Sequence, residues 1–351
     1  MRALIITRTN DNESVGYVAR ALEKRGARPF RLDTDRFPTQ VRATIRVENG
    51  STSGRIEDRG DSLDVSELAG AWHRRLEIGG GIPLTMDKRL RMPSIEESRR
   101  VLLGMFASLP CFTIDPAARL RHAEHKQLQL EVARKVGLDV PRTLVTNDAD
   151  SVRAFWEQCS GRVITKMMTG FAVVEEGREK VVFTNPLAES DLESLDQLAL
   201  CPMTFQERLD KALELRVTIV GERVFAASID SSRLERSRTD WRREGLALIQ
   251  DWKPCALPQD VEKGLLALMD AFGLNYGAID VIVTPEGRHV FLEVNPAGEF
   301  FWLDRAGGLP ISEAIADVML GLAPRRMEPK GPAKVVGAAP AGLIAGPPLR
   351  S

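Results

Sequence analysis

The stretch of residues 277–296 constrains the fold more than any other part of the chain, because its pattern is typical of a β-hairpin. Two segments rich in β-branched residues flank a Pro-Glu-Gly turn signal. A turn of even length centred on Glu286 and Gly287 would place Asp280 directly opposite Glu293 on the neighbouring strand. The sequence therefore predicts two carboxylates in register.

One face of this hairpin would be polar, because Asn295 follows Glu293 by the two-residue period of a strand. The apolar residues would share the opposite, core-facing side: Ile279, Val281, Val283, Val290, Leu292 and Val294. Two carboxylates and an amide oxygen suit Mg²⁺ that carries a phosphate ligand. The alternative is a pair of solvated acids on an exposed sheet face.

The opposed carboxylates also predict how the hairpin responds to substitution. Like charges directly across a sheet destabilise it. Replacing Asp280 by Asn, or Glu293 by Gln, is therefore expected to relieve repulsion in the metal-free protein while removing a metal ligand.

Composition excludes several classes of protein. The chain has 351 residues, of which 43% are hydrophobic, so it can bury a large core and is long enough for two or three domains. Its 48 basic and 49 acidic residues nearly cancel, which gives no global charge that favours nucleic acid or a membrane surface. No apolar run could span a bilayer and no signal-peptide pattern is present, so a cytoplasmic protein is expected.

The first part of the chain alternates strand-like and helix-like segments, which predicts an open α/β domain over residues 1–116. Residues 3–7 and 29–32 have strand patterns, and residues 14–25 form a predicted helix between them. The first turn, residues 8–12, lacks the Gly-x-Gly-x-x-Gly pattern of a dinucleotide-binding site. Nucleotide binding is therefore expected elsewhere.

Two α+β units are expected to follow. Residues 117–205 form the central unit, and residues 206–325 form a C-terminal unit that contains the hairpin and helices predicted at 259–272 and 310–322. The remaining residues 326–351 are rich in Pro, Gly and Ala, which predicts a disordered tail.

Several residues outside the hairpin could bind a phosphate-bearing ligand. Lys126 and Lys166 each offer a point charge, although a single lysine is more often a plain surface residue. The segment 206–208 could offer backbone groups to a nucleobase, and the Glu214 carboxylate could accept hydrogen bonds from ribose hydroxyls.

Arginines could bind a carboxylate group of a substrate. Arg74 lies in the segment Trp-His-Arg-Arg that ends at Arg75, and Arg233 follows a Ser-rich segment. A guanidinium binds a carboxylate through two parallel hydrogen bonds. A solvated basic turn is an equally weighted alternative for Arg74. The arginines between residues 236 and 243 suit either an acidic peptide or a solvated face.

In chain order, these residues resemble the ATP-grasp carboxylate-amine ligase superfamily over about residues 1–325. More narrowly, the segments 71–75, 165–185, 205–207 and 291–299 resemble the graspetide (microviridin-type) peptide cyclases. Those enzymes use ATP to phosphorylate Asp or Glu side chains of a precursor peptide. Ser, Thr or Lys side chains then attack, and the products are macrocyclic esters or amides.

The resemblance implies an ATP-grasp fold, in which an open N-terminal α/β domain precedes two α+β subdomains that enclose the ATP site. It also implies roles for the site residues, which fall into three groups. The phosphates, adenine and ribose of ATP would contact Lys126, Lys166, Gln206, Glu207, Arg208 and Glu214. One or two Mg²⁺ ions would bind Asp280, Glu293 and Asn295. Arg216 could stabilise the acyl phosphate, while Arg74 and Arg233 remain candidates for the peptide carboxylate on the basis of their chemistry.

Three activities stay open at this point. The leading one is an ADP-forming macrocyclase that acts on a ribosomally made precursor peptide with a leader segment, and for which the resemblance implies a homodimer. The second is a ligase that adds an amino acid to a protein or peptide carboxylate. The third is a catalytically silent nucleotide- or peptide-binding module, against which the intact set of metal ligands argues.

Overall fold

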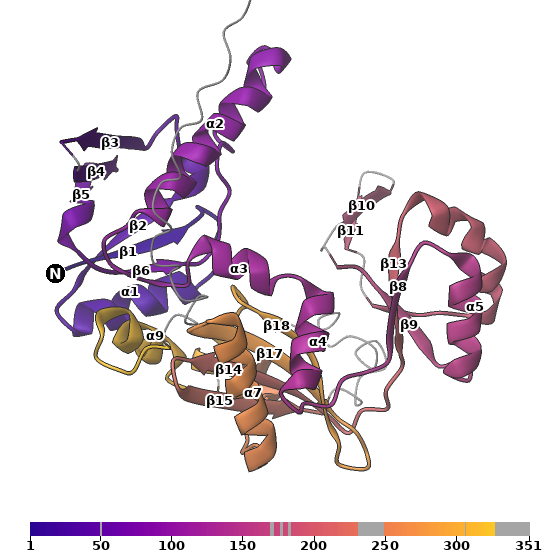
Figure 1. Ribbon diagram of the computed structural model, residues 1–351. Helices are drawn as coiled ribbons and strands as arrows, with labels where there is room; N and C mark the ends of the chain where they lie inside the picture. Colours follow the sequence, from indigo (N-terminus) through magenta and orange to yellow (C-terminus); the bar gives the residue numbers. More distant parts are fainter. Residues whose placement is uncertain are drawn as a thin grey trace, which may run out of the picture.

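The computed structural model confirms an N-terminal α/β part followed by two α+β parts (Figure 1). It describes residues 1–49, 51–168, 172–175, 178–181, 184–230, 249–305 and 307–326, with only the backbone described for 172–175 and 178–181. Arg233, the arginines of residues 236–243 and, beyond residue 326, the predicted tail lie outside the described residues. No described helix has the length and apolar character needed to cross a membrane.

The N-terminal part is built on a four-stranded parallel sheet. Its order is β2-β1-β6-β7, formed by β1 (Arg2–Thr7), β2 (Arg28–Asp33), β6 (Leu68–His73) and β7 (Phe112–Ile114). All six residues of β1 are buried, as its continuous apolar pattern predicts. Strand β2 lies on one side of β1, and the chain later forms β6 on the other side of β1. This places a topological switch point, where α/β sheets bind ligands, between β1 and β6.

Helices and a small second sheet surround this parallel sheet. Helix α1 (Ser14–Lys24) ends before Gly26, which has a positive φ of 75°. Strands β3 (Arg42–Glu48), β4 (Ser51–Asp58) and β5 (Asp61–Asp64) form an antiparallel sheet.

Helix α2 (Lys88–Ala107) is the longest described helix of the N-terminal part. The Asp87 side chain caps it by accepting a hydrogen bond from the backbone N–H of Arg89, 2.9 Å away. Pro93 lies inside the helix, so the proline does not mark its beginning.

Two helices connect the N-terminal part to the central part. Helix α3 (Ala117–Ala123) and helix α4 (Lys126–Lys135) are separated by Glu124 and His125. The break explains the mixed apolar spacing of the sequence. It also places Lys126 in the first turn of α4.

The central part is an antiparallel sheet covered by helical segments. Its order is β12-β9-β13-β8, formed by β8 (Thr143–Thr146), β9 (Val163–Lys166), β12 (Asn185–Pro186) and β13 (Met203–Glu207). Helix α5 (Ala149–Gln158) and the 3₁₀ segment η3 (Glu189–Leu200) contribute to its hydrophobic core. A separate hairpin, β10 (Ala172–Glu175) and β11 (Arg178–Val181), lies beside this sheet (Figure 1).

The C-terminal part is a five-stranded antiparallel sheet of order β16-β15-β14-β17-β18. Its strands are β14 (Leu213–Val220), β15 (Arg223–Ile229), β16 (Lys253–Pro254), β17 (Tyr276–Val283) and β18 (His289–Asn295). Helix α7 (Gln259–Phe272), which has the predicted bounds, packs its apolar side into the core of this sheet. The short α8 (Phe301–Arg305) was not predicted.

Helix α9 (Ile311–Leu320) joins the C-terminal part to the N-terminal part. In Figure 1 it lies beside α1, and residues of both helices belong to one hydrophobic core. Arg25 adds a 2.6 Å ion pair with Asp317. The two ends of the described chain are therefore packed together, which fixes the parallel sheet relative to the hairpin.

Gly70 in β6 tests this packing, because a Cβ atom there would lie 2.3 Å from the backbone oxygen of Met319 in α9. Gly70→Ala is expected to lower the free energy of unfolding by about 1–3 kcal/mol, measured by urea denaturation. Gly104→Ala is the matched control, because nothing lies within 4 Å of that position on α2, and the change should stabilise by about 0.5–1 kcal/mol. Equal effects of the two substitutions would show that α9 does not press on β6.

Candidate active site

The hairpin has the predicted pair of opposed carboxylates. Asp280 in β17 pairs with Glu293 in β18. The turn differs from the prediction, because Val283 pairs with His289 and five residues connect the strands. A bulge then restores the register: Leu292 is the extra residue between the pairs made by its neighbours.

The bulge changes which side chains enter the core. Phe291 is buried with Ile279, Val281 and Val294, whereas Leu292 is only half-buried. Val290 is buried too, but it pairs with Ile282 and so lies on the face of Asp280. The prediction that Val290 and Leu292 share the core-facing side is therefore wrong, since one inserted residue exchanges the two faces.

Each carboxylate of the hairpin has a cationic partner. The Arg216 Nη1 atom lies 2.7 Å from Asp280 Oδ1, and Arg216 is next to Asp280 across the β14–β17 pair. The Lys126 Nζ atom lies 3.0 Å from Glu293 Oε2 and 3.1 Å from Asn295 Oδ1. The expected repulsion in the metal-free hairpin is therefore wrong, because neighbouring cations already compensate both negative charges.

Glu293 is the centre of this arrangement. Burial by itself raises its pKa, but the positive charges of Lys126 and Lys166 outweigh burial and hold the pKa well below its ordinary value. Asn295 adds a 2.9 Å hydrogen bond from Nδ2 to Glu293 Oε1. The structure thus brings together two lysines from different parts of the chain, and keeps Glu293 ionised at neutral pH.

These side chains suit a magnesium ion that is also bound by phosphate. Among the described residues, no group of three His, Cys, Asp or Glu side chains forms a metal site without further ligands. Protein Mg²⁺ sites with bound phosphates use one or two carboxylates and complete the shell with phosphate oxygens and water. Asp280, Glu293 and the amide oxygen of Asn295 fit that pattern. Lys126 and Lys166 add the positive charge that a polyphosphate needs.

The residues predicted to contact adenine lie at the junction of the central and C-terminal sheets. Gln206 is buried in β13 and donates from Nε2 to Thr143 Oγ1 over 2.8 Å. The Glu207 carboxylate is 2.8 Å from Arg142 Nε, and Arg208 is exposed at the end of the strand. Their contacts with a nucleotide stay predictions.

Glu214 is the second residue of β14, on the C-terminal side of this junction. Its Oε1 atom lies 2.8 Å from Lys211 Nζ, and both side chains are largely buried. The beginning of β14 thus holds a largely buried carboxylate close to the point where the chain passes from one sheet to the other. A role in ribose binding stays a prediction.

The predicted arginines have different environments. Arg74 is only 1% exposed, and its Nη1 atom donates to the carbonyl oxygens of Ala297 and Gly298, which follow β18. Arg216 is also buried, and its guanidinium lies 5.4 Å from the centre of the Trp302 ring. Arg233 lies outside the described residues. Arg74 therefore positions the segment after the metal ligands, and its contact with a substrate stays a prediction.

Three residues near Arg74 were missed by the sequence interpretation. Asp11 and Asn12 follow β1, and Glu299 follows Asn295 by four residues. Asp11 and Glu299 form ion pairs with Arg74 and Arg75, and Asn12 donates a hydrogen bond to Glu299. Nothing in their local pattern marks them. The signal that could have located them is topological, since β1 and β6 end side by side at the switch point of the sheet.

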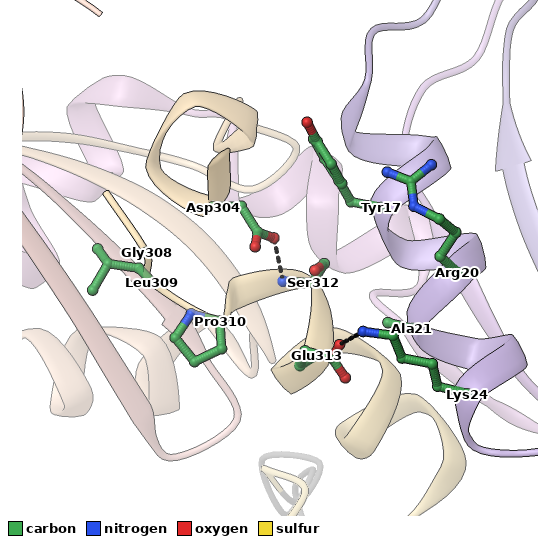
Figure 2. A pocket seen from close by; sticks show the side chains of 10 residues that line it. All are labelled: Tyr17, Arg20, Ala21, Lys24, Asp304, Gly308, Leu309, Pro310, Ser312 and Glu313. Atoms are coloured by element: carbon green, nitrogen blue, oxygen red, sulfur yellow. Dashed lines mark hydrogen bonds and ion pairs between the residues drawn. The ribbon is translucent and has the colours of Figure 1, made fainter. Parts of the chain in front are cut away.

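A separate hollow lies between α1 and the segment that leads into α9 (Figure 2). Its volume is about 330 Å³, and Tyr17, Arg20 and Lys24 line one side. The opposite side includes Glu313, which forms a 3.0 Å ion pair with Lys24. None of the predicted site residues lines this hollow, so it is distinct from the candidate active site.

Comparisons with known proteins agree with this geometry. Residues 2–121 match the family model described as the MvdD pre-ATP grasp domain. The chain is 45% identical to macrocyclase MdnC of Microcystis aeruginosa MRC, whose structure holds the precursor peptide MdnA; the match covers 92% of this chain and 100% of that one, with a TM-score of 0.83.

A second solved relative is the RiPP-associated ATP-grasp ligase of Chryseobacterium gregarium, in complex with ADP, and a leader and core peptide. It is 39% identical, with 93% of this chain and 98% of that chain covered and a TM-score of 0.89. Among curated proteins, β-citrylglutamate synthase B of Danio rerio is 25% identical over 131 residues. That alignment covers 37% of this chain and less than a third of that relative.

The parallel N-terminal sheet, the two antiparallel sheets and the acidic hairpin define an ATP-grasp fold, which confirms the predicted fold class. At 45% identity over the full length of a solved relative, the chain belongs to the ATP-grasp ligase family of peptide macrocyclases. The domain boundaries expected at residues 116, 205 and 325 stay predictions.

Proposed function

We propose that the protein is an ATP- and Mg²⁺-dependent macrocyclase that joins Asp or Glu side chains of a ribosomally made precursor peptide to Ser, Thr or Lys side chains. The observation that carries the proposal is the environment of Glu293, which is opposed by Asp280 and held by Lys126 and Lys166. Anionic oxygens and cationic nitrogens alternate there, as the binding of a metal–polyphosphate requires.

The chemistry has two displacements. A carboxylate oxygen of the peptide attacks the γ-phosphorus of ATP, the bond to the bridging oxygen breaks and ADP leaves. A hydroxyl or amine of the same peptide then attacks the acyl carbon, phosphate leaves and the proton of the nucleophile is released. Each ring therefore consumes one ATP and removes one water from the peptide.

The side chains of this protein supply position and charge. Asp280, Glu293 and Asn295 would hold Mg²⁺, which when bound would neutralise negative charge on the phosphates of ATP. Lys126 would exchange its contact with Glu293 for phosphate oxygens, and the charge of Lys166 would act on the same phosphates. Arg216 would leave Asp280 and stabilise the negative charge that develops during transfer. The amino-acid ligase remains the second activity, and it differs by requiring a free amine.

A leader segment on the peptide, a homodimer and a cytoplasmic location are further parts of the proposal. The relative with bound leader and core peptide supports the leader, since it is similar to this chain over nearly its whole length. Light scattering of the purified protein measures the oligomeric state directly, and a monomer mass would remove the homodimer.

The proposal predicts the products of a defined reaction. Purified protein, Mg²⁺, ATP and a candidate precursor peptide that contains Asp or Glu together with Ser, Thr or Lys should give ADP and peptide masses lower by whole numbers of water molecules. Intact-mass spectrometry and an ADP assay on the same sample make the measurement. A peptide mass raised by a free amine minus water would instead identify the amino-acid ligase, and no ADP with any peptide would identify the silent module.

A further inference from the structure

A cluster of donor groups lies where β1 and β6 end. It consists of Asn12, Arg74 and Arg75, and is called the arginine cluster below. Asp11 supports it: its carboxylate accepts hydrogen bonds from Thr7 Oγ1 at 2.6 Å and from the Asn12 backbone N–H at 2.9 Å. The Asp11 side chain is fully buried and lies 3.6–3.7 Å from both guanidinium groups.

One edge of the Arg74 guanidinium, formed by Nε and Nη2, faces the carboxylates of Asp11 and Glu299. The Arg74 side chain is 1% exposed, yet Nε and Nη2 make no hydrogen bond to any described group. These two atoms form the edge through which a guanidinium binds a carboxylate with two parallel hydrogen bonds. Glu299 Oε1 lies 2.5 Å from Nη2 and Asp11 Oδ2 lies 3.7 Å from Nε, so this edge already holds acids and is suited to hold a carboxylate.

The carboxylate of Glu299 now lies against the arginine cluster. It forms ion pairs with Arg74 Nη2, 2.5 Å away, and with Arg75, and it accepts a hydrogen bond from Asn12 Nδ2. The Arg74–Glu299 contact is an ion pair that engages this edge of Arg74. Glu299 is 22% exposed and Arg75 is 32% exposed, so solvent reaches the cluster from the side of Glu299.

The arginine cluster is also tied to the metal-binding hairpin. The segment that carries Glu299 begins at Asn295, and it is held by Arg74 through Ala297 and by the Tyr276 hydroxyl, which donates to the Gly298 oxygen over 2.7 Å. A short segment, anchored at residues 297 and 298, therefore connects the arginine cluster to the predicted metal ligand Asn295.

We propose that the arginine cluster binds the Asp or Glu side chain of the peptide that is to be phosphorylated, and that Glu299 occupies its place until the peptide displaces it. This inference rests on the proposed function. When the peptide carboxylate replaces Glu299, the two positive charges of Arg74 and Arg75 are still balanced by Asp11 and one other carboxylate. The site therefore stays neutral in both states, and it favours a side-chain carboxylate over an uncharged amide.

Substitution of Glu299 and of Arg75 should change peptide affinity in opposite directions. Glu299→Ala removes the internal competitor, so the KM for the peptide should fall about tenfold, the factor by which a competing state reduces apparent affinity when it is about 90% populated. Arg75→Met removes a charged donor, and the KM should rise about tenfold to a hundredfold.

Glu67→Gln, an exposed change on η2 (Val65–Glu67), is the control. A rise in KM for Glu299→Ala would overturn the proposal, because that is what a purely supporting role predicts.

A second measurement does not require any peptide. Acetate should bind the vacated cluster in Glu299→Ala and raise its Tm by about 2–4 °C relative to chloride at equal ionic strength. The wild type and the double variant Glu299→Ala/Arg75→Met should show no such rise. If acetate fails to stabilise Glu299→Ala, the inference is wrong even when the enzyme is active. If acetate stabilises it and no peptide is ever modified, the carboxylate site stands and the proposed function fails.

Discussion

Glu293→Gln is expected to reduce peptide-dependent ADP formation by about a thousandfold or more. Gln keeps the shape of the side chain but removes the charge that compensates Lys126 and Lys166, and it replaces a carboxylate ligand by a weaker amide oxygen. A loss of about 4 kcal/mol in the stabilisation of the transition state corresponds to this factor, and metal sites contribute several kcal/mol. ADP release at saturating Mg²⁺ measures the effect.

The same variant should be less stable than the wild type at neutral pH, by about 1–3 kcal/mol, because the buried lysine contacts lose their counter-charge. The pKa of Glu293 is lower in the folded protein than in the unfolded chain, so its contribution is present above its ordinary pKa and disappears as the pH falls through the folded value. The stability difference between wild type and variant should therefore shrink as the pH falls below about 4.5.

Glu286→Gln is the matched control, since Glu286 is exposed in the turn of the same hairpin. It should retain normal ADP formation and stability. Should Glu293→Gln keep more than about a tenth of wild-type activity, a factor worth only about 1.4 kcal/mol, Glu293 is not a metal ligand in the reaction.

The acidic hairpin illustrates what the sequence could predict. A turn signal between two β-rich segments was enough to predict that Asp280 faces Glu293, because opposite residues in a hairpin follow from simple counting. The bulge at Leu292 could not be predicted from the spacing of residues around the turn. It depends on Phe291 filling the core beneath β17, which is a requirement of tertiary packing and leaves no local signal.

The charges around the hairpin were predicted less well than its shape. Repulsion between the carboxylates followed from the hairpin alone, but Arg216 reaches Asp280 from another strand and Lys126 reaches Glu293 from a helix distant in sequence. Likewise, the motif that contains Arg74 was visible, whereas its burial under Glu299 depends on how the segment after β18 meets the N-terminal sheet. Residue type indicated the chemistry, and only the fold indicated which charges meet.

Arg216→Met is expected to have two effects of opposite sign on the use of magnesium. The maximum rate of ADP formation should fall by about a hundredfold to a thousandfold, because a buried donor directed at developing charge is lost. The Mg²⁺ concentration that gives half of that rate should also fall, because Arg216 pairs with Asp280 at 2.7 Å and competes with the metal for it. A titration of initial rates with Mg²⁺ at fixed ATP separates the two effects.

Arg216→Lys should recover part of the rate while keeping the competition, and Arg46→Met, an exposed change on β3, should alter neither quantity. A higher Mg²⁺ requirement in Arg216→Met would contradict the competition, and would mean that Arg216 holds Asp280 in place for the metal.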